Sequence, residues 1–308
     1  MSSADTPKGA PSRYSKYLVV AVPYVWLLVF FLAPFLIIFK MSFSTTAIAM
    51  PPYTPAFDGF TGFWAKIGQL SFDNYSWLLS DDLYIRAYLS SLRIAVVSTV
   101  ILLLIGYPVA YAMARAPSTI RPTLLMMMIL PFWTSFLIRV YAWIGILKPE
   151  GLLTVALQWL HIFGPDEQVR IFNTEWAVYI GIVYSYLPFM VLPLYSALEK
   201  LDGTLLEAAQ DLGCRPIKTF WVITFPLSMP GVIAGSFLCF IPIMGEFVIP
   251  DLLGGSGTLM IGRTLWVEFF SNRDWPLSAA VAVILLLILV VPIVLFQNHV
   301  AKSQEAGR

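Results

Sequence analysis

Long apolar runs constrain this chain more than any other feature of its sequence. Six stretches are predominantly apolar over about twenty residues or more: 18–39, 92–114, 123–147, 176–198, 228–250 and 277–298. About 20 apolar residues span the hydrocarbon layer of a bilayer, and a single segment satisfies its backbone there only as a helix. Only 12% of the residues are charged, against about 25% in soluble domains. We therefore expect an all-α membrane protein with six transmembrane helices.

The basic residues predict how these helices are oriented. An even number of spans places both termini on one side, where Lys and Arg occur in short segments: Lys8, Arg13, Lys16, Arg115, Arg121, Lys200, Arg215, Lys218, Lys302 and Arg308. The other side carries its Lys and Arg in longer loops, and short cytoplasmic loops are the ones enriched in these residues. We expect cytoplasmic tails at 1–17 and 299–308 and a cytoplasmic loop at 200–226. The first run exceeds the core of a secretory signal, so it is expected to be retained.

Several functional classes are excluded by the sequence. The net charge of +1 and the lack of a basic cluster argue against nucleic-acid binding. The stretch "GCRPIKT" is not a phosphate loop, because Leu212 and Ile217 stand where its two glycines must be. The two histidines and two cysteines have no metal-site or disulfide spacing. We expect no catalytic residue, no metal and no cofactor, so any ATP must be hydrolysed by a partner chain.

The stretch "EAAQDLGCRPIKTFWVITFP", residues 207–226, is unusually polar and well specified for this chain. Thr204 and Glu207 have the spacing of a capping box at the start of a short helix. Gly213 can end that helix in a left-handed conformation, and Pro216 suits the first turn of a second helix. We expect a rigid helix–turn–helix on the cytoplasmic face that leads through Pro226 into the fifth span.

The same stretch resembles the EAA loop of ABC-importer permeases. The residues that carry the resemblance are Glu207, Ala208, Ala209, Gly213, Ile223, Phe225 and Pro226. In that family a short coupling helix inserts into a cleft of a cytoplasmic ATPase. The resemblance implies that Glu207 anchors this contact and that Ala208 and Ala209 allow close approach. Alternatively, Glu207 serves only the capping box, and the two roles are compatible. Phe225 departs from the leucine that is usual in the family.

Three further segments, 130–147, 179–213 and 245–255, look like polyamine-importer permeases, especially the first of the two permease subunits of putrescine-type systems. The resemblance implies a type I importer bundle in the bacterial inner membrane. It also implies three partners: a homologous second permease in a heterodimer, a cytoplasmic ABC ATPase dimer and a periplasmic polyamine-binding protein. The sequence does not separate putrescine from spermidine.

Candidate substrate contacts follow from the chemistry of a protonated amine, which binds carboxylates and aromatic faces. Glu246 and Asp251 lie near the outer end of the fifth span, and Pro250 is expected to interrupt the helix between them. Glu246 either contacts substrate or forms an internal ion pair with Arg139 of the third span. The aromatic candidates are Tyr141, Tyr184 and Phe189, with Tyr186 close by; Trp143 fits an interfacial belt better.

Two other interpretations stay open at this point. One is an importer of the same architecture for another small organic cation or an amino acid. The other is a self-sufficient carrier or channel, which would have no use for an ATPase-docking helix. The outer segment 41–91, rich in aromatic residues with interspersed charges, is expected to form a folded surface that contacts another protein.

Overall fold

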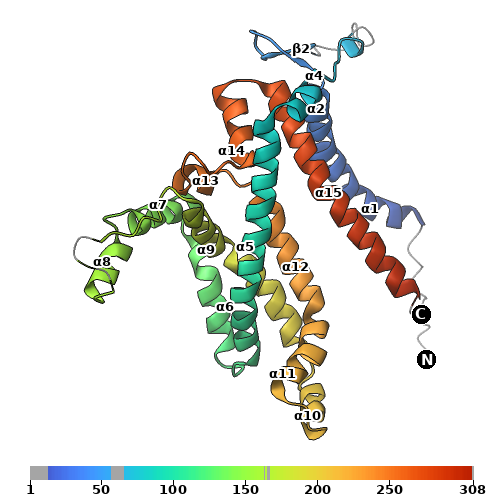
Figure 1. The fold of residues 1–308 in the computed structure, drawn as a ribbon. Helices are drawn as coiled ribbons and strands as arrows, with labels where there is room; N and C mark the ends of the chain where they lie inside the picture. Colours follow the sequence, from blue (N-terminus) through green and yellow to red (C-terminus); the bar gives the residue numbers. More distant parts are fainter. Residues whose placement is uncertain (1–12, 57–65, 163, 165–166, 307–308) are drawn as a thin grey trace, which may run out of the picture. The chain divides into compact units, whose positions relative to one another are not determined.

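The computed structural model describes residues 13–56, 66–162, 164 and 167–306. These described residues form two compact units, one drawn from 79–267 and the other from the stretches before 79 and after 267. Both units are built mainly from helices, as the apolar runs predict, and Figure 1 shows their ribbons. The larger unit contains the candidate site.

Three long helices form the core of the larger unit: α5 (Asp82–Arg115), α9 (Glu175–Glu199) and α12 (Phe225–Met244). They lie side by side and pack against one another (Figure 1). Glycines let the backbones approach closely around Met190 of α9. A Cβ on Gly106 would lie 2.9 Å from Met190 Cγ, and one on Gly235 would lie 3.0 Å from the Met190 carbonyl oxygen. Small residues at helix crossings are typical of membrane bundles, in which van der Waals packing drives association.

The third apolar run, 123–147, is not the continuous helix that its composition predicts. It forms α6 (Arg121–Ile129), the 3-10 turn η2 (Leu130–Trp133) and α7 (Phe136–Leu147), with a bend of 89° between its two halves. Pro131 supplies no N–H to the helix, and Thr134 and Ser135 take extended ψ angles of 150° and 136°. The chain therefore leaves the helix at this point and restarts in a new direction. The short α8 (Leu152–Trp159) follows.

The fifth apolar run also differs from its predicted bounds. After α10 (Gly203–Asp211), the segments α11 (Pro216–Thr219) and η3 (Phe220–Thr224), a π-helical turn, continue directly into α12. The helix ends at Met244, and α13 (Val248–Leu253) and α14 (Ile261–Trp266) follow. The expectation that Pro250 interrupts the helix is wrong. Pro250 lies in the first turn of α13, where its missing N–H would have had no partner in the helix.

The smaller unit combines the first and last apolar runs. Its first helix consists of α1 (Arg13–Leu27), the π-helical turn η1 (Leu28–Leu32) and α2 (Ala33–Met41). After η4 (Val267–Ser271), the last helix, α15 (Trp275–Ala306), packs against α2. Between Val20 and Met41 only Met41 is buried, as suits a surface that faces lipid or another chain.

The outer segment 41–91 is folded where the structure describes it. A hairpin pairs β1 (Thr45–Thr46) with β2 (Tyr53–Thr54), and the Thr46 hydroxyl donates a 2.6 Å hydrogen bond to Asp274, just before α15. α4 (Asp73–Ser80) follows, and Phe43 contacts the rings of Phe72 and Tyr75, each at 5.1 Å between centroids. Residues 57–65 lie outside the described part of the chain. A contact with another protein stays a prediction.

Helices occupy all six predicted runs. Four helices are long and apolar enough to cross a bilayer: Val20–Met41, Asp82–Arg115, Glu175–Glu199 and Pro216–Met244. The bent α6–α7 pair would add a fifth span. In α15 the apolar part extends over Trp275–Val291. α1 and α15 reach into the predicted tails 1–17 and 299–308, of which 1–12 and 307–308 lie outside the described residues. The cytoplasmic placement of both termini stays a prediction.

Candidate functional site

A cavity of about 750 Å³ lies in the larger unit, where the bent third run meets α9 and the broken end of α12. Its walls are mainly aromatic and aliphatic, and they include one carboxylate and one guanidinium. The lining residues are Phe132, Phe136, Arg139, Ser185, Tyr186, Phe189, Leu238, Pro242, Gly245, Glu246, Phe247 and Val248. Both departures from regular helix, at η2 and at Gly245, therefore border this space. A concave, mostly apolar site with a few polar groups is typical of small-ligand pockets.

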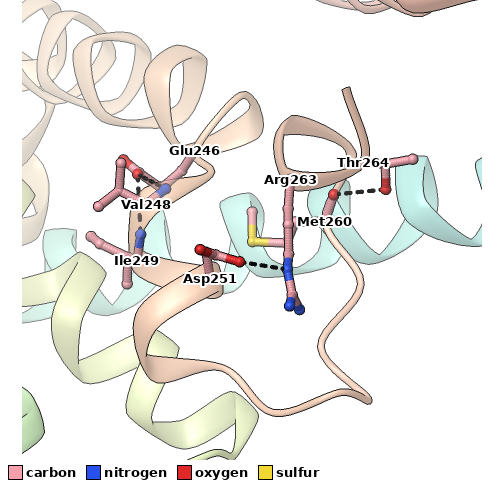
Figure 2. A network of polar contacts seen from close by, with 7 residues as sticks. All are labelled: Glu246, Val248, Ile249, Asp251, Met260, Arg263 and Thr264. Atoms are coloured by element: carbon pink, nitrogen blue, oxygen red, sulfur yellow. Dashed lines mark hydrogen bonds and ion pairs between the residues drawn. The ribbon is translucent and has the colours of Figure 1, made fainter. Parts of the chain in front are cut away.

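Glu246 is the acidic group of the cavity, and the residue is only 7% exposed. The Tyr186 hydroxyl donates to one carboxylate oxygen at 2.6 Å. The backbone N–H groups of Val248 and Ile249 donate to the other oxygen at 3.0 and 3.4 Å (Figure 2). These two N–H groups are free because α13 begins here and its first turn has no carbonyl partners of its own. The helix break at Gly245 thus creates the donors that hold Glu246.

Arg139 is the basic group of the same cavity. Its guanidinium lies 5.2 Å from the ring centroid of Phe132 and 5.8 Å from that of Phe136. Its Nε is buried and has no hydrogen-bond partner. Of the two alternatives for Glu246, the internal ion pair is not formed in this structure, since none of the ion pairs found among the described residues joins it to Arg139. The carboxylate and the guanidinium face one cavity but hold different partners.

The α10 segment lies at the end of the larger unit away from α13 and α14 (Figure 1). The predicted capping box is wrong, because the side chain of Asp202 caps the helix by accepting the Thr204 N–H at 3.0 Å. Hydrogen bonds from Thr204 hold the pKa of the Asp202 carboxyl below its usual value. Since the helix starts at Gly203, Glu207 is too far along it to reach back to the cap. Glu207 is exposed instead, as is Ala208, whereas Ala209 is buried.

The end of α10 agrees with the sequence-based expectation. Gly213 has a φ of +77°, the left-handed conformation that favours glycine. The Cys214 N–H donates to Ala209 O at 2.9 Å and the Gly213 N–H to Gln210 O at 2.8 Å, which together form a Schellman motif. Pro216 then occupies the first turn of α11. The result is a short exposed helix with both of its ends fixed.

Comparison with known protein families decides the class of the chain. Residues 103–304 match the family described as the binding-protein-dependent transport system inner membrane component. The chain belongs to this family. It is therefore a permease of the inner membrane, and its several apolar helices agree with a multi-pass protein.

Curated relatives cover most of the permease. It is 41% identical over 278 residues to the spermidine/putrescine transport system permease protein PotB of Salmonella typhimurium strain SL1344, covering 90% of this chain and 91% of the relative. It is 47% identical over 217 residues to the protein of the same name from Escherichia coli strain K12, covering 70% and 78%. The expected family resemblance is confirmed.

Solved structures share the fold of the permease. One is a bacterial ABC transporter that imports the acidic polysaccharide alginate, with a TM-score of 0.66 at 19% identity over 94% of this chain and 96% of that one. A second alginate transporter structure, in complex with a periplasmic protein bound to an alginate pentasaccharide, gives 0.68 at 17% identity over 94% of both chains. The all-α architecture of a type I ABC-importer permease is thereby confirmed.

The structure brings together only some of the predicted substrate contacts. Glu246 and Phe189 line the cavity of the permease, whereas the other three candidates lie outside its lining. Asp251 is exposed and forms an ion pair with Arg263 at 3.0 Å (Figure 2). Tyr184 packs edge-on against Trp143 at 5.4 Å between ring centroids. Tyr141 is more than half exposed.

Sequence reasoning missed part of the cavity wall. The lining residues that were not proposed are Phe132, Phe136, Ser185, Leu238, Pro242, Gly245, Phe247 and Val248. Helical spacing could have found two of these, because Phe136 stands three residues before Arg139 and Ser185 stands four before Phe189, on shared helix faces. The 89° bend that carries Phe132 toward this face has no such signal in the sequence.

Proposed function

We propose that the chain is a permease subunit of an ATP-driven importer for polyamines, putrescine or spermidine or both. The observation that carries the proposal is a buried carboxylate on an aromatic cavity, in a chain whose relatives are spermidine/putrescine permeases. An ionisable side chain among apolar helices is costly, so it marks a functional site by default. A carboxylate suits a cationic cargo.

The chemistry of the cavity matches the chemistry of a polyamine. Tyr186 donates to one oxygen of the Glu246 carboxylate, and the Val248 and Ile249 N–H groups donate to the other. A carboxylate has about four lone-pair sites, so it can also accept an ammonium group. Phe132, Phe136, Phe189 and Phe247 supply ring faces, each worth about 0.5–2 kcal/mol to a nearby cation. The methylene chain between the amines would contact the apolar wall.

The coupling part of the proposal concerns α10. A binding protein delivers the polyamine on the outer side, and a cytoplasmic ABC ATPase dimer binds and hydrolyses ATP. The exposed Glu207 and Ala208 contact that ATPase. ATP binding moves α10, and the capped ends of this helix transmit the movement to α12. The permease pairs with a homologous second permease, and both of its termini lie in the cytoplasm. During transport the helix bundle alternates between inward and outward access.

The test is uptake of labelled putrescine and spermidine into proteoliposomes. These contain this chain, the second permease, the ATPase dimer and the binding protein, with ATP supplied on the cytoplasmic side. Glu246→Gln removes the negative charge of the cavity, so uptake should fall while the ATPase still co-purifies. Asp251→Asn is the matched control, because Asp251 is an exposed carboxylate outside the cavity. Glu207→Ala should reduce ATP-driven uptake by weakening the docking contact.

Three outcomes would contradict parts of the proposal. Normal uptake by Glu246→Gln would remove the substrate role of this residue. Uptake of another organic cation or an amino acid, without polyamine uptake, would keep the importer and change its cargo. Uptake by this chain alone, without ATP or ATPase, would mean that the protein is a carrier or channel.

A further inference from the structure

The cavity carries a cation of its own. A guanidinium stays protonated under all ordinary conditions, so Arg139 contributes one positive charge to a space whose acidic group is Glu246. Burying a charge is unfavourable unless it is paired and hydrogen-bonded. Arg139 as a residue is half-buried, but its Nε is buried without a hydrogen-bond partner, and none of the ion pairs among the described residues joins the guanidinium to Glu246. A cationic cargo that enters this space meets a like charge.

The position of this cation is informative. The guanidinium of Arg139 lies within 6 Å of two ring centroids, at 5.2 Å from Phe132 and 5.8 Å from Phe136. That distance is the range in which a ring face attracts a cation. An ammonium group recognises an aromatic face by the same electrostatic attraction. The protein's own guanidinium therefore occupies a place that an amine of the cargo could occupy.

We propose that the faces of Phe132 and Phe136 form a subsite for a second ammonium group, and that Arg139 holds this subsite until the cargo displaces it. The inference rests on the proposed function and assigns two subsites to the one cavity. Glu246 binds the first ammonium group, with Tyr186 positioning the carboxylate. The second ammonium group replaces the guanidinium on the rings.

This arrangement makes Arg139 a specificity-determining residue. A monoamine can neutralise Glu246, but it leaves Arg139 in place and is repelled by it. A diamine or longer polyamine gains the aromatic subsite as well, which offsets the displacement of Arg139. The permease should therefore select cargo by the number of its ammonium groups.

The experiment measures binding of labelled putrescine and labelled butylamine to the purified complex of both permeases and the ATPase dimer. The binding protein is left out, so that its own selectivity does not contribute. In Arg139→Met the rings are freed and the repulsion is lost, so putrescine should bind roughly tenfold more tightly and butylamine binding should become measurable. Arg139→Lys keeps a cation and should retain discrimination against butylamine. Arg263→Met is the matched control, because Arg263 is paired with Asp251 outside the cavity.

If the wild-type complex binds putrescine, unchanged binding of both amines in Arg139→Met would overturn the proposed role of Arg139 and leave the proposed cargo standing. Weaker putrescine binding in that variant would also overturn it, because Arg139 would then support the binding site and would not compete with the cargo. A wild-type complex that binds neither putrescine nor labelled spermidine would overturn the proposed cargo and this role of Arg139 together. If Arg139→Met does not assemble, Phe132→Leu should weaken putrescine binding severalfold through loss of the ring face. No change in Phe132→Leu would reject the subsite.

Discussion

Glu246 shows how a helix bundle keeps a carboxylate away from water. The residue follows the last turn of α12, and the break after it exposes two backbone N–H groups that donate to the side chain. Tyr186, from α9, supplies the third donor. Hydrogen bonds to a charged group are stronger than neutral ones, so the three donors together compensate for much of the lost hydration. The carboxylate remains on the cavity wall, where it can still bind a cation.

The hydroxyl of Tyr186 gives a prediction at this scale. Tyr186→Phe removes the 2.6 Å hydrogen bond to Glu246 and keeps the ring. A hydrogen bond to a charged group contributes about 1.5–3 kcal/mol, so polyamine uptake should fall about tenfold or more, though less than in Glu246→Gln. Initial uptake rates in proteoliposomes measure the effect. Tyr184→Phe serves as the control, since Tyr184 packs on Trp143 outside the cavity lining. Equal rates in both variants would show that the hydroxyl does not position Glu246.

Prediction from sequence succeeded at single residues where one residue type carries the signal. An acid within an apolar run singled out Glu246, which the structure places on the cavity wall, while its contact with substrate stays a prediction. A glycine at the end of a polar helix predicted the left-handed turn at Gly213. It failed where the outcome depends on competition between neighbours. Asp202 and Thr204 are both good capping residues, and Asp202 forms the cap, which moves the helix start and leaves Glu207 free of the capping box.

At the scale of the element, the cap of α10 gives a second prediction. Because its native pKa is lowered, the Asp202 carboxylate stabilises α10 fully above its unfolded pKa, and this stabilisation is lost as the pH falls through the lowered pKa. Asp202→Ala should therefore weaken co-purification of the ATPase at neutral pH. Asp202→Asn should preserve it, because asparagine caps helices equally well, and should remove this contribution to acid sensitivity. If Thr204→Ala were the more harmful change, the capping box predicted from sequence would be the better description.

The far end of α10 gives a third prediction. Gly213→Ala places a Cβ at a φ of +77°, a conformation that costs a non-glycine residue roughly 1–2 kcal/mol. The new methyl group meets no atom within 4 Å, so backbone strain alone is tested. Gly203→Ala is matched to it, since its Cβ also meets open space and its φ is not positive. ATP-driven uptake should fall in Gly213→Ala and remain near wild type in Gly203→Ala. Equal uptake in both would show that coupling tolerates a loosened helix end.

The bend in the third run shows where element prediction stops. Pro131 predicts a kink in a membrane helix, yet neither its angle nor its direction is encoded locally. Two extended residues after the 3-10 turn raise the bend to 89° and bring Phe132 and Arg139 to one cavity. The end of α12 is similar. A helix can end at either Gly245 or Pro250, and in the structure α12 ends at Met244, just before Gly245. Apolarity predicts that a segment enters the membrane, and tertiary packing decides its path.

At the scale of the whole molecule, composition and motif spacing were sufficient for the fold class. The apolar runs require helices, and the EAA-like spacing pointed to the family that the comparisons confirm. Orientation rests on a different kind of evidence, the density of Lys and Arg in short loops. That bias is statistical and acts during insertion, so the arrangement of the helices does not test it. The orientation also determines whether α10 can reach a cytoplasmic ATPase.

The two native cysteines allow a direct test of this orientation. Cys214 lies in the turn after α10 and is partly exposed, whereas Cys239 lies in α12 and is fully buried. A membrane-impermeant maleimide should therefore label one cysteine per chain in inside-out vesicles and none in right-side-out vesicles. Cys214→Ser should abolish the label, and Cys239 should react only after denaturation. Because Cys214 directly follows Gly213, bound ATPase should slow its labelling. Labelling from the outer side would place α10 where no ATPase can reach it, so the orientation and the docking role would be rejected together.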